Sequence, residues 1–253
     1  MNSSAGGPNG EVKLAVVIPT LNEAHDLPAL LSRVLSDGAD LVVVSDGGSE
    51  DTTMQLARDA GAIAIAAERG RGQQLQAGAD VALDQGADLL WFVHADNVPQ
   101  PGALQALRLA AQESVSNPTL TQAWGCRQRV AAEGRFYRLV ERKADRRVAA
   151  GLVYGDSGLC VTASAYRRVG GYRGIPIFED LDISKRLAAE GPIALVRGAE
   201  ILVNPRRWQG EGALRTTVRN WMLTRAWNLG VPPERLVRFY PANRADSKPV
   251  EIK

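Results

Sequence analysis

Cysteine is scarce in this chain of 253 residues, which contains only Cys126 and Cys160. Two cysteines cannot build a disulfide framework, and by themselves they cannot form a metal site. Long apolar runs are also missing, because the longest stretches, such as Leu89 to Val93, are far too short to cross a bilayer. Residues 1–10 are rich in Gly, Ser and Asn without an apolar centre, so we expect neither a signal peptide nor a membrane anchor there. These features favour a reducing, cytoplasmic location.

The composition that is present belongs to a globular protein. Hydrophobic residues make up 45% and charged residues 23%, which excludes a disordered, collagen-like or coiled-coil chain. No linker-like stretch and no internal repeat divides the sequence. We therefore predict one domain over residues 11–241, with disordered residues 1–10 before it and a flexible tail over 242–253.

The charge is divided unevenly between the two halves. Residues 1–125 contain 6 basic and 15 acidic residues, a net charge of −9, whereas residues 126–253 contain 24 basic and 13 acidic residues, a net charge of +11. An acidic first half suits a cation or a neutral ring system, and an arginine-rich second half suits phosphates or an anionic surface. The total of +2 and the lack of a recognisable binding module argue against nucleic acid as a partner.

Apolar runs alternate with segments of helical periodicity through the first hundred residues. This alternation predicts an α/β fold with a parallel sheet and right-handed crossovers. We expect strands over 12–18, 41–44, 62–66 and 88–93, and helices over 24–36, 50–60 and 72–84. After Pro101 the pattern changes. There we expect helices over 102–113, 133–150, 181–190 and 213–229, and strands over 122–130 and 193–203.

A carboxylate follows each of the four expected strands in the first half. A single polar residue after a strand can have a purely structural role. Asn22 and Ser49, for example, are both suited to cap the helix that follows them. Parallel strands, however, end at one edge of the sheet, where α/β proteins bind their ligands. Carboxylates at all four ends therefore predict a site at that edge: Glu23, Asp46, Glu68 and Asp96.

Several short motifs occur in a distinctive order. The first half contains VVIPTLNE, VVVSDGGSEDTT, RGRGQQLQAGA and LLWFVHADN, and the second half contains GDSG, GGY, FEDLD and RRW. Over Val12 to Tyr240 this order resembles the inverting family 2 glycosyltransferases with the GT-A fold, a mostly parallel sheet flanked by helices. It is most similar to a bacterial subgroup encoded near radical-SAM and selenium-related genes. The resemblance implies a nucleotide-sugar-binding half over 11–100 and an acceptor and catalytic half over 101–241.

The resemblance also implies roles in donor binding. In such enzymes the segment after the first strand cups the nucleobase, usually uracil, and the carboxylate after the second strand accepts a hydrogen bond from the base. Glycine beside that carboxylate leaves room for the ribose, and a basic residue lies nearby. The positions that match these roles are Pro19, Leu21, Glu23, Asp46, Gly47 and Arg71.

The fourth strand carries the metal motif of the family, which is usually Asp-X-Asp. Here the tripeptide is His94-Ala95-Asp96. The resemblance gives Asp96 the role of holding Mn²⁺ or Mg²⁺ against the donor diphosphate, with phosphate oxygens and waters completing the coordination. For His94 three interpretations stay open, namely a metal ligand, a ribose contact or a packed residue.

The acid–base element of the resemblance is Glu179-Asp180. An inverting transferase needs one base to take the proton from the acceptor, and Asp180 matches that position. Glu179 is expected to raise the pKa of Asp180 by like-charge repulsion. Both residues also suit the first turn of the helix that follows, so a structural and a catalytic role are compatible. Asp156 matches a position that lines the donor-sugar or acceptor pocket.

The remaining implied contacts lie in the basic second half. Arg206 and Arg207 match residues that bind the leaving diphosphate, while Trp208 either stacks on a sugar or packs in the core. The arginine-rich helices expected over 133–150 and 214–229 would suit an anionic membrane surface, although core packing and solvated faces also explain them.

The sequence thus predicts transfer of a sugar from a UDP-sugar to an acceptor hydroxyl with inversion, by a metal-assisted single displacement. The acceptor is expected to be a small molecule or a lipid-linked molecule. A nucleotidyltransferase is one alternative, but the PTLNE segment after the first strand lacks the basic residues of that class. A non-catalytic nucleotide-sugar-binding protein is another, kept open by the missing first Asp of the metal motif.

Overall fold

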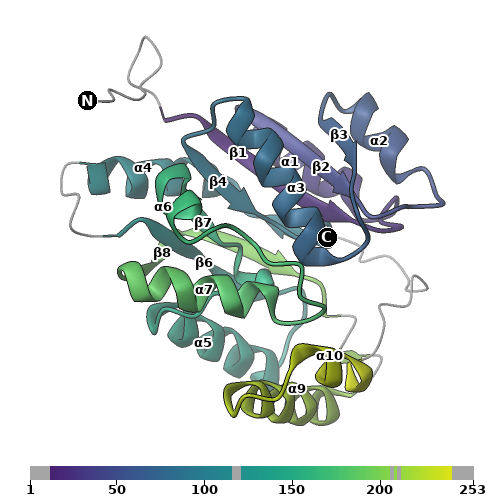
Figure 1. Cartoon of the computed structure of the whole chain (residues 1–253), viewed down its shortest axis with the longest axis vertical. Coiled ribbons are helices and arrows are strands. Elements are labelled where there is room, and N and C mark those ends of the chain that lie inside the picture. Colours follow the sequence, from purple (N-terminus) through teal and green to yellow (C-terminus); the bar gives the residue numbers. More distant parts are fainter. Residues whose placement is uncertain (1–11, 116–120, 206–207, 210–211, 241–253) are drawn as a thin grey trace.

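The computed structural model describes residues 12–115, 121–205, 208–209 and 212–240. The predicted disordered N-terminus and C-terminal tail lie outside these ranges. Within them, eight strands form one sheet in the order β3-β2-β1-β4-β7-β6-β8-β5 (Figure 1). The strands are β1 (Leu14–Thr20), β2 (Leu41–Asp46), β3 (Ile63–Ala66), β4 (Leu89–Phe92), β5 (Asn97–Pro99), β6 (Ala123–Val130), β7 (Cys160–Thr162) and β8 (Ile193–Val203).

The first half of the sheet is parallel, as predicted. β1 pairs with β2 on one side and β4 on the other, and β2 pairs with β3, all in parallel. Pro19 is tolerated in this central strand because β4 pairs only with Leu14 to Val17, so the missing N–H of Pro19 breaks no ladder. The carboxyl ends of these strands consequently share one edge.

Helices cover both faces of the sheet because side chains along β1 alternate between two cores. Leu14, Val16 and Ile18 pack on one face with α1 (Leu27–Ser36), α2 (Thr53–Asp59) and α4 (Ala103–Val115). Ala15 and Val17 pack on the other face. The helices there are α3 (Arg71–Asp84), α5 (Arg135–Ala149), α6 (Ala163–Arg168) and α7 (Glu179–Glu190).

The second half of the sheet departs from a simple parallel order. β7 lies antiparallel between β4 and β6, and β5 is antiparallel to β8, whereas β6 and β8 are parallel. The sequence did not predict β5, β7 or α6, because segments of three to six residues are too short to show a period. The fold is nevertheless α/β with a mostly parallel sheet, as expected.

The last described elements form a small cluster of their own at the lower end of Figure 1. They are α9 (Ala213–Asn228), α10 (Pro233–Leu236) and a 3₁₀ turn, η2 (Val237–Phe239). Leu223 and Leu236 pack there against Ile177, which precedes α7. In the described part of the chain no helix has the length and apolar character needed to span a bilayer.

Candidate functional site

The loops that follow β1 and β2 are tied together at the carboxyl edge of the sheet. Asn22 adopts a left-handed conformation with φ of 55°. Its backbone N–H donates to Ser49 Oγ at 2.8 Å, and its Oδ1 accepts from the backbone N–H of Glu50 at 2.8 Å. The alternative that Asn22 and Ser49 cap the next helices is contradicted, since the capping positions of α1 and α2 are Asp26 and Thr52. Both residues instead fix the shape of the edge.

Asp46 is buried at the end of β2, and its carboxylate is fully used by the chain. Oδ1 accepts from Thr20 Oγ1 at 2.9 Å and from Ser49 Oγ at 2.5 Å. Oδ2 accepts from the backbone N–H groups of Gly48 at 3.0 Å and Ser49 at 2.7 Å. A carboxylate offers about four such positions. A nucleobase N–H would therefore have to replace one of these donors. Of the two hydroxyls, that of half-buried Ser49 is more accessible than that of buried Thr20.

Gln74 is a buried residue that sequence reasoning did not select. Its Nε2 donates to the carbonyl oxygens of Thr20 at 2.6 Å and Ser45 at 3.1 Å, so α3 holds the ends of β1 and β2 together. A Cβ on Gly47 would lie 3.0 Å from this amide. Gly47 thus makes room for Gln74. The signal was the RGRGQQLQ motif, which contains a polar residue on the buried side of an amphipathic helix.

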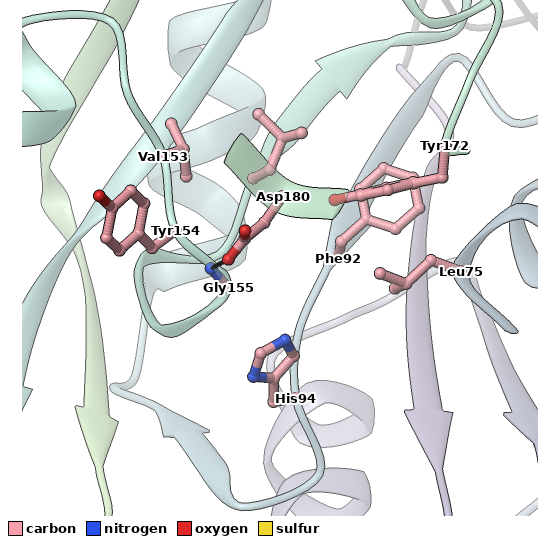
Figure 2. A pocket seen from close by; sticks show the side chains of 9 residues that line it. Leu75, Phe92, His94, Val153, Tyr154, Gly155, Tyr172 and Asp180 are labelled. Carbon is pink, nitrogen blue, oxygen red and sulfur yellow. Dashed lines mark hydrogen bonds between the residues drawn. The ribbon is translucent and has the colours of Figure 1, made fainter. Parts of the chain in front are cut away.

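The predicted acidic pair opens α7, as expected. Phe178 just before it is left-handed, with φ of 68°, and this turn directs the two carboxylates to different partners. Asp180 Oδ2 accepts from the backbone N–H of Gly155 at 2.7 Å (Figure 2). Its Oδ1 accepts from the backbone N–H of Leu181 at 2.7 Å. Burial raises the pKa of Asp180, and the charge of Glu179 raises it further, against the opposing effect of Arg71.

Glu179 forms an ion pair with Arg71 that joins α7 to the start of α3. Glu179 is buried, whereas Arg71 is half-buried. Burial alone would lower the pKa of Arg71, but the charges of Glu179 and Asp180 outweigh it and raise that pKa above its ordinary value. The sequence placed Arg71 near Asp46. The structure pairs it with Glu179, beside the candidate base.

His94 and Asp96 follow β4, and Asp156 lies within the 3₁₀ turn η1 (Gly155–Ser157). His94 Nδ1 lies 3.8 Å from Asp156 Oδ1, and a Cβ on Gly155 would lie 2.1 Å from His94 Cε1, so the imidazole packs on the Gly155 backbone (Figure 2). Across the ranges described, no three His, Cys, Asp or Glu side chains gather as a metal site would require. The donor set of this edge therefore fits a cation only if a bound ligand supplies the remaining oxygens.

Two pockets meet at Asp180 and Tyr154. A narrow pocket, shown in Figure 2, is lined by Leu75, Phe92, His94, Val153, Tyr154, Gly155, Leu159, Tyr172 and Asp180. A wider cleft of about 450 Å³ is lined by Arg71, Tyr154, Ile177, Phe178, Asp180, Asn220, Leu223, Thr224 and Tyr240. One carboxylate thus faces both spaces.

Arg147 is a second residue that sequence reasoning missed, because the sequence alone does not distinguish it from the exposed arginines of its helix. Its Cζ lies 3.8 Å above the ring of Tyr154, and its Nε is buried without a hydrogen-bond partner. Among the described residues no carboxylate lies within 4.0 Å of it. Burial lowers the pKa of Arg147, although the charges of Asp156 and Asp180 act in the opposite direction. A cation without a salt-bridge partner beside the pockets suits an anionic ligand.

The remaining predicted residues are placed as follows. Pro19 is buried in β1, and Leu21 and Glu23 are half-buried in the loop after it, where the backbone N–H of Glu23 donates to Thr53 Oγ1 at 2.9 Å. Trp208 is half-buried, lies 6.3 Å from the ring of Tyr137 and contacts the core, as the packing interpretation expects. Arg206 and Arg207 lie outside the described residues.

Comparison with known proteins agrees with this architecture. Residues 15–169 match the family described as Glycosyl transferase family 2. Glycosyltransferase AglJ of Haloferax volcanii is 38% identical over 64 residues, which are 25% of this chain and 21% of that protein. An undecaprenyl-phosphate 4-deoxy-4-formamido-L-arabinose transferase of Aeromonas hydrophila is 45% identical over 62 residues, 22% of this chain and 19% of that protein. The matched segments span about a fifth of these two relatives.

Solved structures share the fold over most of the chain. A mannosyltransferase from Pyrobaculum calidifontis, solved with GDP-Man and Mn²⁺, is 19% identical with a TM-score of 0.61, covering 93% of this chain and 70% of its own. Glucosyl-3-phosphoglycerate synthase from Mycobacterium tuberculosis, solved with Mg²⁺ and UDP, is 18% identical with a TM-score of 0.58, covering 88% and 81%. These likenesses establish the GT-A fold.

Proposed function

Because the chain belongs to glycosyl transferase family 2, we propose that it transfers a sugar from a nucleotide-sugar to an acceptor hydroxyl, with inversion in a single displacement. The observation that carries this proposal is the position of Asp180. Its carboxylate is held by two backbone N–H groups and faces both the narrow pocket and the wider cleft. A general base between donor and acceptor needs that placement.

In the proposed reaction the acceptor lies in the cleft and its hydroxyl oxygen attacks the anomeric carbon of the donor sugar. The proton of that hydroxyl passes to Asp180, while the bond from the anomeric carbon to the diphosphate breaks on the opposite face. The raised pKa makes Asp180 a stronger base than a carboxylate in water. The hydrogen bonds from Gly155 and Leu181 orient it, and the Glu179–Arg71 pair supports it from α3.

We propose that the donor is a UDP-sugar bound at the carboxyl edge of β1 and β2. Pro19, Leu21 and Glu23 would contact the base, and Asp46 would accept its N–H after the Ser49 hydroxyl moves. Gly47 would border the ribose. The support comes from the hydrogen bonds that join the two loops at this edge and from a GT-A relative whose structure holds UDP. The mannosyltransferase relative holds GDP-Man, so the base has to be tested directly.

We propose that Asp96, with His94 close by, would hold Mn²⁺ or Mg²⁺, and that oxygens of the donor diphosphate would supply further ligands. The ion would neutralise charge that develops on the leaving diphosphate. Arg206 and Arg207 are proposed to bind the same diphosphate by charge-assisted hydrogen bonds. The support is that structural relatives hold Mn²⁺ or Mg²⁺ and that the donor set here needs oxygens from a ligand.

The acceptor is proposed to be a small or lipid-linked molecule, and Asp156 to line the place where it meets the donor sugar. We assign to Arg147 the binding of an anionic group on one of the two substrates, since it has no salt-bridge partner among the described residues. A cytoplasmic location and the likeness to the subgroup encoded near radical-SAM and selenium-related genes stay predictions.

The test is thermal stabilisation by UDP, CDP, GDP and ADP, each with and without Mn²⁺, followed by turnover of UDP-sugars by the wild-type chain and Asp180→Asn. We expect stabilisation by UDP with Mn²⁺, and UDP binding by Asp180→Asn with turnover lost. No response to any nucleotide would favour a non-catalytic protein. Full turnover by Asp180→Asn would remove Asp180 as the base. Equal stabilisation by UDP with and without Mn²⁺ would indicate that arginines, and not a metal ion, bind the diphosphate.

A further inference from the structure

The C-terminal helix α9 has two faces of different character. Its inner face packs Leu223 against Ile177 and Leu236 and lines the cleft. Its outer face exposes large apolar side chains, with Trp221 at 62% and Met222 at 58% exposure. Of the eight large hydrophobic residues that are exposed in the described ranges, five lie in this region: Val218, Trp221, Met222, Leu229 and Phe239. Such clustering marks an interaction surface.

Helical spacing joins these side chains into one stripe with basic residues. Positions 215, 218, 222, 225 and 229 are separated by three or four residues, which places them on one side of the helix. Arg215 and Arg225 thus lie on the same side of the helix as Val218, Met222 and Leu229. The Arg225 guanidinium lies 5.8 Å from the ring of Trp221. Residues 213–233 contain no Asp or Glu, so the stripe has charge of one sign only.

We propose that this outer face of α9 docks on an anionic lipid bilayer. Apolar side chains interleaved with arginine and tryptophan match the interface of a bilayer, where the rings enter the headgroup region and the guanidinium groups meet lipid phosphates. The single sign of charge favours an anionic surface over a second copy of this chain, because a self-complementary contact would place these arginines against each other.

A second helix supports the same orientation. The outer face of α5 exposes Arg135, Arg142, Lys143 and Arg146, together with Leu139 at 49% exposure. α5 and α9 both lie at the lower end of the longest axis of the molecule (Figure 1). Exposed basic side chains on both helices concentrate positive charge at this end of the molecule (Figure 1), which a charged bilayer would attract.

Docking on this face would set the cleft at the lipid surface. Asn220 and Thr224 on the inner side of α9 line the cleft that contains Asp180. The thickness of one helix thus separates the docking face from the candidate base. This consequence rests on the proposed function and favours an acceptor carried by a lipid, whereas docking itself does not depend on that function.

The experiment is co-sedimentation of the full chain with phosphatidylcholine vesicles that contain or lack phosphatidylglycerol. Trp221→Ser/Met222→Ser tests the apolar part of the stripe and Arg215→Gln/Arg225→Gln tests its charge. Controls are Leu35→Ser/Leu109→Ser on α1 and α4, which also remove exposed apolar side chains. All six substitutions lie at exposed positions, and thermal unfolding checks that each variant is folded.

We expect binding to vesicles with phosphatidylglycerol and little to those without it. The serine pair should weaken binding at least about tenfold. The glutamine pair should weaken it roughly thirtyfold at low salt, since each arginine near a charged bilayer contributes about 1 kcal/mol. The control pair should bind like the wild-type chain.

Absence of vesicle binding would overturn the proposal, as would equal binding to both vesicle types. Concentration-dependent dimers in sedimentation velocity that the serine pair abolishes would assign the face to a second copy instead. None of these readouts involves nucleotide or sugar, so docking can fail while the proposed glycosyl transfer stands. A catalytically inactive chain that sediments with anionic vesicles would leave docking intact.

Discussion

Replacing Arg71 by Met tests the ion pair behind the candidate base. Glu179 is 1% exposed, and within the described residues it forms a salt bridge with Arg71. Arg71→Met keeps the unbranched stem of the side chain and removes the guanidinium with its charge, so a carboxylate is left buried and uncompensated. Glu179→Gln makes the opposite change and leaves a guanidinium whose side chain is 34% exposed. Water can hydrate that group once its partner is gone.

The two variants should therefore differ in stability. Breaking a buried ion pair by removing one partner costs about 3–5 kcal/mol. Because the partial exposure of Arg71 lets water approach Glu179, we expect the lower end, about 3 kcal/mol, for Arg71→Met. A chain of this size loses about 2–4 °C of Tm per kcal/mol, so Tm should fall by roughly 6–12 °C. Glu179→Gln should lose only about 1 kcal/mol, as half-exposed pairs do.

Urea denaturation and thermal unfolding at neutral pH measure both changes, and the double variant Arg71→Met/Glu179→Met serves as the control. Two apolar side chains in place of a buried pair are often neutral, so the double variant should be more stable than Arg71→Met alone. The reasoning is refuted if Arg71→Met loses less than about 1 kcal/mol. Equal losses in Arg71→Met and Glu179→Gln would also contradict it.

Other changes test the site itself. The proposed base, Asp180, would work only when deprotonated, and Glu179 raises its pKa, so Glu179→Gln should move the acid limb of kcat/KM to lower pH. An unmoved or raised limb in the pH profile would contradict this. Gly155→Ala places a Cβ 2.1 Å from His94 Cε1 and should lower kcat about a hundredfold by displacing the carboxylate that Gly155 holds. Unchanged kcat would show that the contact relaxes freely. Gly72→Ala places a Cβ 2.2 Å from a backbone carbonyl oxygen and should cost about 1–3 kcal/mol in urea denaturation.

Much of the fold could be predicted from the sequence because its first half is regular. The expected strand over 41–44 is β2 (Leu41–Asp46), and the expected helix over 72–84 is α3 (Arg71–Asp84). Hydrophobic periodicity carries that information within each element. The antiparallel strand β7 (Cys160–Thr162) could not be found this way. Its three residues show no period, and its place between β4 and β6 is set by contacts far along the chain.

The candidate site shows the same limit. Residue type and motif order pointed to Asp180 and Glu179, and α7 does begin there. The partners of these residues did not follow from the sequence, because Arg71 lies 108 positions from Glu179. Arg147 was hidden for a related reason. Its helix contains six basic residues, Arg147 included, and only the packing against Tyr154 distinguishes Arg147 from the exposed ones.

The two pockets that meet at Asp180 draw on different stretches of sequence. Most of the residues that line the narrow pocket lie between 75 and 172, whereas most of those that line the cleft lie between 177 and 240. Within the cleft side, α9, α10 and η2 pack around Ile177 as a small cluster of their own, separate from the two cores of the sheet. Substitutions there can accumulate without disturbing the strands that shape the narrow pocket. Under the proposed function, changes in α9, α10 and η2 would therefore alter the acceptor that this scaffold takes, while its donor site would be inherited unchanged.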